Sequence, residues 1–228
     1  MITPDQTVFL VDVDNTLLDN DRIQADLKRH LEREFGEACR DRYWAILEQL
    51  FSELGYRDYL GALQRFRVEH PKDIHLLSMS SYLVDYPFAN RLYPGAIDVL
   101  ERLRGWARTA ILSDGDVVFQ PRKVERSGIF EAVDGHVLIY IHKEEELDDV
   151  EQRYPASHYV LVDDKPRILA TVKMAWGDRV TTVLPRQGQF AHAPDAASYQ
   201  PAADLTVERI GELLAYDFGD FTAARGIS

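Results

Sequence analysis

The sequence predicts an α/β protein, a Rossmann-like parallel sheet core with an inserted all-helical segment. The first observation is a set of five short apolar runs, often β-branched, at residues 7–13, 108–114, 136–141, 158–164 and 179–184. The second is that amphipathic stretches separate the later runs, an alternation typical of a parallel sheet covered by helices on both faces. The third is that residues 18–90 show only helical periodicity.

Three apolar stripes predict the helices of the insert. The first follows Asn20, a candidate N-cap, and steps by four residues from Ile23 to Phe35. The others run from Tyr43 to Leu54 and from Leu60 to Phe66. Stripes of this kind are core faces of amphipathic helices far more often than functional surfaces.

After the insert, the chain is expected to return to the sheet at "LYPGAIDVLERLRG". Pro94 lies near the start of this predicted helix, and Gly105 at its end. Further helices are predicted within residues 117–130, 142–154 and 165–177, and a surface loop at 191–204. The predicted division is a core domain of residues 1–17 and 91–228 and a helical domain of residues 18–90.

Composition and charge exclude several functions. The chain has 228 residues and a formal net charge of −12, which would repel nucleic-acid phosphates in the absence of a basic patch. The single cysteine, Cys39, excludes an internal disulfide. No apolar run approaches the roughly 18 residues of a membrane helix, and no signal-type segment is present. We expect a soluble, cytoplasmic protein with neither a membrane nor a nucleic acid as partner.

Polar residues stand at the ends of the predicted strands, in the segments "DVDNT", "ILSDG", "IHKEE" and "VLVDD". Ligands of parallel sheets bind beyond the carboxyl ends of the strands, so these residues can share one site. Burial of their charges is costly unless a cation compensates it. The candidates are Asp12, Asp14, Ser113, Asp114, Gly115, Lys143, Asp163 and Asp164.

The paired acids of the first segment suit phosphoryl transfer. A carboxylate can attack phosphorus and form an aspartyl-phosphate, and Asp12 at the strand end is the candidate nucleophile. Asp14 is the candidate acid that protonates the leaving oxygen and then deprotonates water. A phosphate brought to several carboxylates requires a hard cation, and Mg²⁺ with oxygen ligands meets that need.

The second and third segments supply groups for the phosphate. Ser113, together with the backbone amides of Asp114 and Gly115 at an expected helix start, can hold phosphoryl oxygens. Lys143 can neutralise the charge that gathers as the phosphoryl group approaches Asp12. These residues predict a site for a small phosphorylated metabolite.

In this order, the four segments resemble the motifs of the haloacid dehalogenase-like (HAD) hydrolase superfamily. The resemblance covers about residues 7–19 and 90–186 and includes "LYPGAIDVLERLRG" and "QPRKVERSGIF". It implies a phosphatase whose helical insert, residues 18–90, is placed like the family's cap domain.

The resemblance also implies the metal ligands. They would be Asp12, the backbone carbonyl of Asp14 and one acid of the last motif. Asp164 is favoured over Asp163, because the second acid of the pair usually binds the metal in this family. The alternative is that Asp164 orients Lys143.

Several residues receive structural interpretations. Asn15 stands where many family members have glycine, and asparagine tolerates a left-handed backbone. Lys123, a rival to Lys143, is interpreted as a surface lysine. Three histidines that flank strands are left structural: His136, His142 and His158.

Alternative functions stay open. Haloacid dehalogenases of this superfamily attack carbon without Mg²⁺ but lack the second acid of the first motif, so Asp14 argues against that activity. A phosphomutase would keep all four motifs and differ in its cap. An aspartate-phosphorylated signalling domain would be about half this length, and a catalytically inactive binding protein would not need the intact acids.

Overall fold

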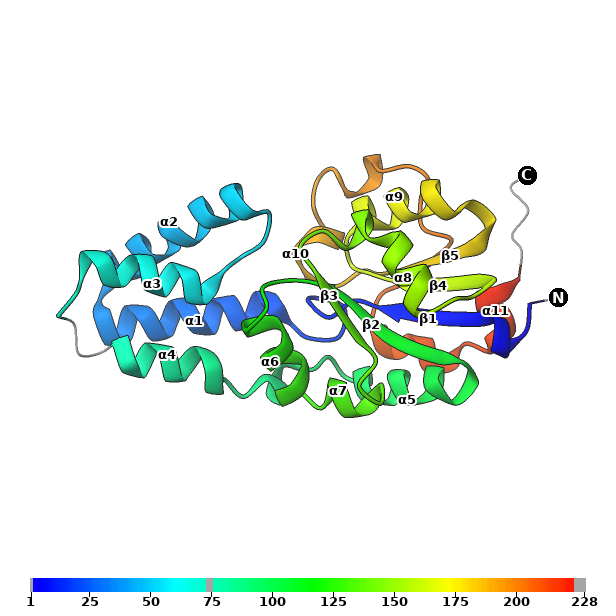
Figure 1. The fold of residues 1–228 in the computed structure, drawn as a ribbon, viewed down its shortest axis with the longest axis horizontal. Coiled ribbons are helices and arrows are strands. Elements are labelled where there is room, and N and C mark those ends of the chain that lie inside the picture. The colour runs from blue at the N-terminus through cyan, green and yellow to red at the C-terminus, as the bar shows by residue number, and fades with distance from the viewer. Residues whose placement is uncertain (1, 73–75, 224–228) are drawn as a thin grey trace.

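The computed structural model describes residues 2–72 and 76–223, and its centre is a six-stranded, all-parallel sheet (Figure 1). The strand order is β3-β2-β1-β4-β5-β6. This confirms the predicted α/β fold class. The strands are β1 Thr7–Val11, β2 Arg108–Asp114, β3 Val137–Tyr140, β4 His158–Val162, β5 Val180–Pro185 and β6 Leu205–Val207.

Strand β1 occupies the middle of the sheet and is buried along its whole length. Val11, its last residue, pairs with Ile111 of β2 on one side and with Val162 of β4 on the other. Because all three strands run in the same direction, their carboxyl ends lie next to one another. The residues that follow these strands are therefore brought together by the sheet itself.

Alternate residues of β1 enter two separate apolar cores. Phe9 and Val11 pack with α5 (Ala96–Trp106), α7 (Ile129–Ala132) and α11 (Phe218–Thr222). Val8 and Leu10 pack on the opposite face, with α8 (Leu147–Arg153) and α9 (Pro166–Trp176). The period of two along a strand explains why this run is apolar without interruption.

The insert after β1 consists of helices with a core of their own. It comprises α1 (Asn20–Phe35), α2 (Glu37–Leu54), α3 (Tyr59–Glu69) and α4 (Leu76–Asp85), and extends beyond the carboxyl end of the sheet (Figure 1). The predicted stripes supply most of its buried side chains. Among the described residues of the insert, none lies in a strand.

Two local predictions need correction. The N-cap of α1 is Asp19, whose side chain accepts the amide hydrogen of Arg22, and Asn20 is the first helical residue. Gly105 lies inside α5, which ends at Trp106. The predicted loop at 191–204 is confirmed from residue 192 on and contains one short 3-10 turn. It leads into β6, a strand that was not predicted because it is too short for its alternation to be recognised in the sequence.

The predicted domain ranges also include residues 1, 73–75 and 224–228, which lie outside the described residues. Within the described part of the chain, none of the helices has the length and apolar character needed to cross a membrane.

Candidate active site

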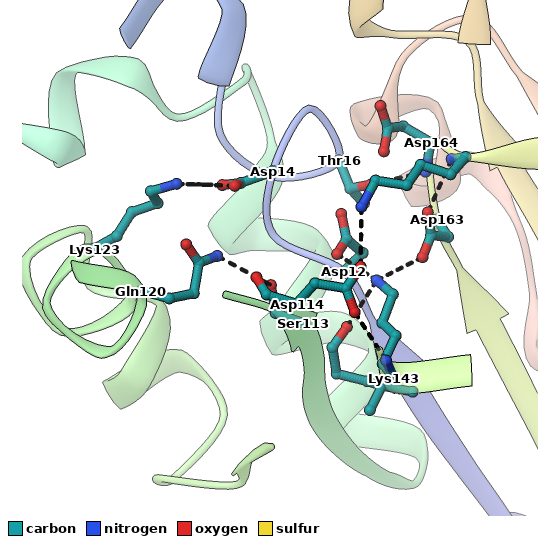
Figure 2. A network of polar contacts seen from close by, with 12 residues as sticks. Asp12, Asp14, Thr16, Ser113, Asp114, Gln120, Lys123, Lys143, Asp163 and Asp164 are labelled. Atoms are coloured by element: carbon teal, nitrogen blue, oxygen red, sulfur yellow. Dashed lines mark hydrogen bonds and ion pairs between the residues drawn. The ribbon is translucent and has the colours of Figure 1, made fainter. Parts of the chain in front are cut away.

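A buried lysine lies between two aspartates at the carboxyl edge of the sheet (Figure 2). The Nζ atom of Lys143 is 2.5 Å from Oδ1 of Asp12, which follows β1, and 2.6 Å from Oδ2 of Asp163, which follows β4. Lys143 opens a 3-10 turn, η3 (Lys143–Glu145), after β3. Three strand ends therefore contribute to one charged cluster, as the sequence predicted.

Two further contacts fix Lys143 in place. Its backbone amide donates to Oδ1 of Asp114 at 2.9 Å, and its Nζ also donates to the carbonyl of Leu112 at 3.1 Å. Burial alone would lower the pKa of Lys143, but the carboxylates of Asp12 and Asp163 outweigh it and raise the pKa well above its usual value. The lysine is therefore a permanent positive charge beside Asp12.

Carboxylate oxygens of Asp12, Asp163 and Asp164 lie within 4.8 Å of one another, and all three residues are buried. Burial, together with the charge of Asp163, raises the pKa of Asp12 to about 6 despite Lys143. Burial and the charges of Asp12 and Asp163 raise the pKa of Asp164 well above its usual value. Lys143 alone does not compensate this density of negative charge.

Some oxygens of this cluster lack a hydrogen-bond partner within the described part of the chain. They are Oδ2 of Asp12, both carboxylate oxygens of Asp164, and Oδ2 of Asp163. Of these, Oδ2 of Asp163 still has an ion-pair partner, because it lies 2.6 Å from Nζ of Lys143. An unpartnered buried polar atom costs about 1–3 kcal/mol, and more when it is charged. A set of hard oxygen donors in need of positive charge fits a cation such as Mg²⁺.

The two acids of the last motif have different partners. Oδ2 of Asp163 contacts Lys143, and its Oδ1 accepts the amide hydrogen of Lys165 at 2.8 Å. The Asp164 amide donates to Oγ1 of Thr16 at 3.1 Å, which ties the loop after β4 to the loop after β1. In this structure it is therefore Asp163 that orients Lys143, and the alternative role considered for Asp164 is not observed.

Asn15 turns the chain directly after the paired acids. Its φ of 60° is left-handed, a backbone conformation that asparagine tolerates. Its side-chain oxygen accepts the amide hydrogens of Asn20 at 3.0 Å and Asp21 at 3.2 Å. The side chain thereby anchors the turn to the first turn of α1 and connects the site to the insert.

Asp14 lies apart from the buried cluster and pairs with a different lysine (Figure 2). Its two carboxylate oxygens are 2.6 Å and 2.9 Å from Nζ of Lys123, which also donates to Oδ1 of Asn20 at 3.2 Å. Lys123 is only 1% exposed. The interpretation of Lys123 as a surface lysine was therefore wrong, because the packing of α6 (Phe119–Arg126) buries it against Asp14.

The Asp14–Lys123 pair gives a stability prediction. Replacing Asp14 with alanine is expected to lower the free energy of unfolding by about 3 kcal/mol, because it leaves the buried Lys123 ammonium without its carboxylate partner, beside the neutral oxygen of Asn20 and the ring of Phe119. The double variant Asp14→Ala/Lys123→Met should recover most of that loss, since it removes the unpaired charge as well. Urea unfolding of the wild type, both single variants and the double variant measures the effect. If the double variant loses as much stability as the two single variants together, the pair is not energetically coupled.

Ser113 is the last buried residue of β2, and its hydroxyl oxygen accepts a hydrogen bond from Nε2 of Gln120 at 3.0 Å. The expected helix start at Asp114 and Gly115 is wrong, because α6 begins at Phe119 and the chain between them forms a loop. The Gly115 amide donates to the Tyr140 carbonyl at 2.9 Å and so is not directed at a ligand. A Cβ at Gly115 would lie 2.6 Å from Cβ of Gln120, so this position requires glycine for close packing.

Asp114 links two lysines. In addition to the Lys143 amide, its carboxylate accepts a hydrogen bond from Nζ of Lys165 at 3.1 Å. Burial raises the pKa of Asp114, but the charges of Lys143 and Lys165 outweigh this and lower it overall. Asp114 therefore acts here as a structural anion rather than through its amide.

Lys165 and Gln120 are candidate site residues that the sequence analysis missed. Lys165 directly follows the Asp163-Asp164 pair, and its position beside a motif was the available signal. Gln120 is 3% exposed and lies three residues before Lys123 on α6, a spacing that places both on one helical face.

A cavity of about 680 Å³ adjoins the cluster, between the sheet and the insert. Asp14, Asp114 and Gly115 line it from the core, and Tyr56 and Arg57 line it from the loop after α2. The more deeply buried residues of the cluster, such as Asp12, lie outside its lining and are almost fully covered.

His142, for which the sequence predicts a structural role, also lines this cavity. Its ring lies against Gly55 at the end of α2, where a Cβ would come within 2.4 Å of the imidazole. The residue before Lys143 therefore contacts the insert directly.

The parallel sheet, the acid–lysine cluster at its carboxyl edge and the helices inserted after β1 define a Rossmann-like α/β protein with an acidic site at the edge of its sheet. The family model of haloacid dehalogenase-like hydrolases matches residues 7–175, and the chain belongs to this family.

Solved structures agree with this assignment. A haloacid dehalogenase-like hydrolase from Burkholderia xenovorans is 61% identical and superimposes with a TM-score of 0.88, over 94% of this chain and 97% of that one. No curated protein matches the chain.

More distant structures share the fold. A HAD hydrolase from Bacillus subtilis, bound to magnesium, is 15% identical, with a TM-score of 0.59 over 92% of this chain and 98% of that one. The L-2-haloacid dehalogenase from Xanthobacter autotrophicus, with covalently bound chloropropionic acid, is 19% identical, with a TM-score of 0.59 over 92% and 96%.

Proposed function

We propose that this protein is a Mg²⁺-dependent phosphatase that hydrolyses a small phosphomonoester through an aspartyl-phosphate on Asp12. The observation that carries the proposal is the buried cluster in which one oxygen of Asp12 contacts Lys143 at 2.5 Å. Its other oxygen and both oxygens of Asp164 lack a hydrogen-bond partner among the described residues. A phosphate and a divalent cation together would satisfy these groups.

Asp12 and Asp164 are the proposed metal ligands, with the Asp14 backbone carbonyl as a third through the family resemblance. Asp163 is less suited to this role because both of its oxygens already have partners, Lys143 and the Lys165 amide. When bound, Mg²⁺ would supply positive charge that offsets the repulsion between the substrate phosphate and the carboxylates.

In the first step, a carboxylate oxygen of Asp12 bonds to phosphorus as the bond from phosphorus to the ester oxygen breaks. Lys143 lies within hydrogen-bonding distance of Asp12 and stabilises the charge that gathers there. The ester oxygen leaves with a proton from Asp14. For this, Asp14 must carry a proton, and its carboxyl must turn from Lys123 toward the leaving oxygen.

In the second step, water attacks phosphorus and the bond between Asp12 and phosphorus breaks, which releases inorganic phosphate. Asp14 accepts the proton of the attacking water. Ser113 is proposed to hold a phosphoryl oxygen in both steps. Gln120 donates a hydrogen bond to the Ser113 hydroxyl oxygen, so the hydroxyl hydrogen of Ser113 can point toward a phosphoryl oxygen. Among the described residues, this hydrogen has only a long contact, 3.4 Å from the hydroxyl oxygen to the Asp114 carbonyl.

Removal of divalent metal tests this proposal. Activity on 4-nitrophenyl phosphate should disappear in EDTA and return with excess Mg²⁺, because uncompensated carboxylates repel the substrate. Asp164→Asn should need more Mg²⁺ for half-maximal activity, since an amide is a weaker ligand than a carboxylate. Asp148→Asn, an exposed acid on α8, is the matched control. EDTA-resistant activity, or chloride release from 2-chloropropionate, would instead favour attack on carbon.

A further inference from the structure

The cavity beside the site is lined by equal numbers of positive and negative side chains, in addition to aromatic rings. The cations are Arg57, Lys123, Lys165 and Arg167, and the anions are Asp14, Asp114, Asp116 and Asp195. A ligand that enters this cavity therefore meets no excess of positive charge. The hydrogen-bond and ion-pair partners of these eight side chains support the same conclusion.

Both lysines pair with acids of the same lining. Nζ of Lys123 is 2.6 Å from the carboxylate of Asp14, and Nζ of Lys165 is 3.1 Å from that of Asp114. Each lysine therefore already has an anionic partner in the lining, and neither offers an uncompensated positive charge to a second anionic group of a substrate.

The two arginines pair with glutamates next to the cavity. Arg57 contacts Glu48 at 3.0 Å, and Arg167 contacts Glu144 at 2.6 Å. These pairs neutralise the guanidinium groups on both sides of the cavity, in the insert and in the core.

The two remaining acids of the lining, Asp116 and Asp195, also accept hydrogen bonds. Oδ1 of Asp116 accepts the amide hydrogens of Val118 and Phe119 at the start of α6, at 2.8 Å and 2.6 Å. Asp195 accepts the hydroxyl hydrogen of Tyr199 at 2.9 Å. Each charged group of the lining thus already has a partner, which is another lining residue, a glutamate beside the cavity or a backbone amide.

The aromatic rings of the lining differ in exposure. Tyr59 and Phe119 are each 4% exposed and belong to the packed interior, but Phe51 is 41% and Phe190 39% exposed. Phe51 is on α2 of the insert and Phe190 on α10 (Gly188–Ala191) of the core, and both line the cavity. Apolar rings left open in a pocket favour an apolar ligand that covers them.

A cation lies near each of these two rings. The Arg57 guanidinium carbon is 5.1 Å from the ring centroid of Phe51, and Nζ of Lys165 is 5.7 Å from that of Phe190. Each ring therefore lies against a paired cation and presents its remaining surface as a stacking platform.

We infer that the substrate is a phosphate monoester of an uncharged alcohol that carries an apolar, flat ring. This inference rests on the proposed phosphatase function and names its substrate class. The phosphate would be held by the acid–lysine cluster, and the ring would contact Phe51 and Phe190. The cavity volume of about 680 Å³ gives room for such a leaving group. The balanced charges disfavour bisphosphates and phosphorylated acids.

Three primary alkyl esters separate the effects of ring and charge: ethyl phosphate, 2-phenylethyl phosphate and ethane-1,2-diyl bisphosphate. Their leaving alkoxides are similar in basicity, so differences in kcat/KM report binding of the leaving group. With Mg²⁺ present, kcat/KM for 2-phenylethyl phosphate should exceed that for ethyl phosphate by about 10-fold or more, given the apolar area a phenyl ring buries. The bisphosphate should be no better than ethyl phosphate.

Ring variants test the named contacts. Phe51→Ala and Phe190→Ala should each lower the ratio of kcat/KM for 2-phenylethyl to ethyl phosphate by about fivefold. Phe130→Ala is the matched control, because this ring on α7 is 44% exposed and lies outside the lining of the cavity. A wild-type ratio below about two, preference for the bisphosphate, or equal ratios in all three variants would overturn the inference.

Calorimetric titration with the same esters distinguishes failure of the inference from failure of the proposed function. If 2-phenylethyl phosphate binds more tightly than ethyl phosphate in a manner that depends on Phe51 and Phe190, but neither is hydrolysed, the ring site stands and the phosphatase proposal falls. If both esters are hydrolysed with equal efficiency, the phosphatase proposal stands and the ring site falls.

Discussion

Asp12→Asn is expected to abolish turnover, with a loss in kcat of at least about 10⁴-fold, because an amide cannot form the acyl-phosphate bond. The effect should be chemical rather than structural, since asparagine has the same shape and its oxygen can still accept the hydrogen bond from Lys143. Steady-state hydrolysis of 4-nitrophenyl phosphate measures the loss. Mass spectrometry of acid-quenched protein should find a mass increase of one phosphoryl group in the wild type and none in the variant.

Loss of the carboxylate also leaves Lys143 with Asp163 as its remaining anionic partner in the cluster. Thermal unfolding must therefore accompany the kinetics, to show that the variant is folded at the assay temperature. The matched control is Asp19→Asn, which changes an acid on the same loop but keeps an N-cap that asparagine fills equally well. Retained activity in a folded Asp12→Asn protein would rule out Asp12 as the nucleophile.

Asp14→Asn should have the second largest effect, a loss of about 10²–10⁴-fold for substrates with poor leaving groups, because it removes general acid–base catalysis. It keeps the backbone carbonyl proposed as a metal ligand, and its side-chain oxygen can still accept from Lys123. The loss should therefore fall on proton transfer. Ethyl phosphate, whose leaving oxygen needs a proton, should suffer most.

A good leaving group separates the two steps. With 4-nitrophenyl phosphate, the phenolate leaves without a proton, so the Asp14→Asn protein should still form the phosphoenzyme. Its hydrolysis should lag, because no base removes the proton from water. Rapid mixing should then show a burst of nitrophenolate close to one per active site, followed by slow turnover. Equal losses for both esters, without a burst, would contradict the assignment of Asp14 as the acid and base.

The local pattern of the sequence determined most of the fold. Continuous apolar runs are required of strands that are buried on both faces, and all five predicted runs form strands of the sheet. The helical stripes of the insert were equally clear, because each helix buries one face in a shared core. The positions of Asp12, Ser113 and Asp163 at strand ends followed from the same runs, since a parallel sheet gathers those ends at one edge.

The partners of the charged side chains were decided only by the tertiary structure. Lys123 looks in the sequence like one basic residue of a polar helix, yet the packing of α6 buries it against Asp14, 109 positions away along the chain. In the same way, the structure rather than the motif decided that Asp163 orients Lys143. The carboxylate oxygens of Asp164 have no hydrogen-bond partner among the residues that the structure describes.

The physical reason is that the spacing of apolar residues along the chain indicates which residues are buried and on which face. This spacing is two residues in a strand and about 3.6 residues in a helix, so it can be read within a single element. Pairing between charges depends instead on distances of 2.5–3.1 Å between elements far apart in sequence. Those distances are fixed only when the sheet, its loops and the helices that cover them pack together. The sequence by itself therefore determined that the strand-end acids and Lys143 meet at the edge of the sheet. The tertiary structure added Lys165 and Gln120 and decided what each of these residues contacts there.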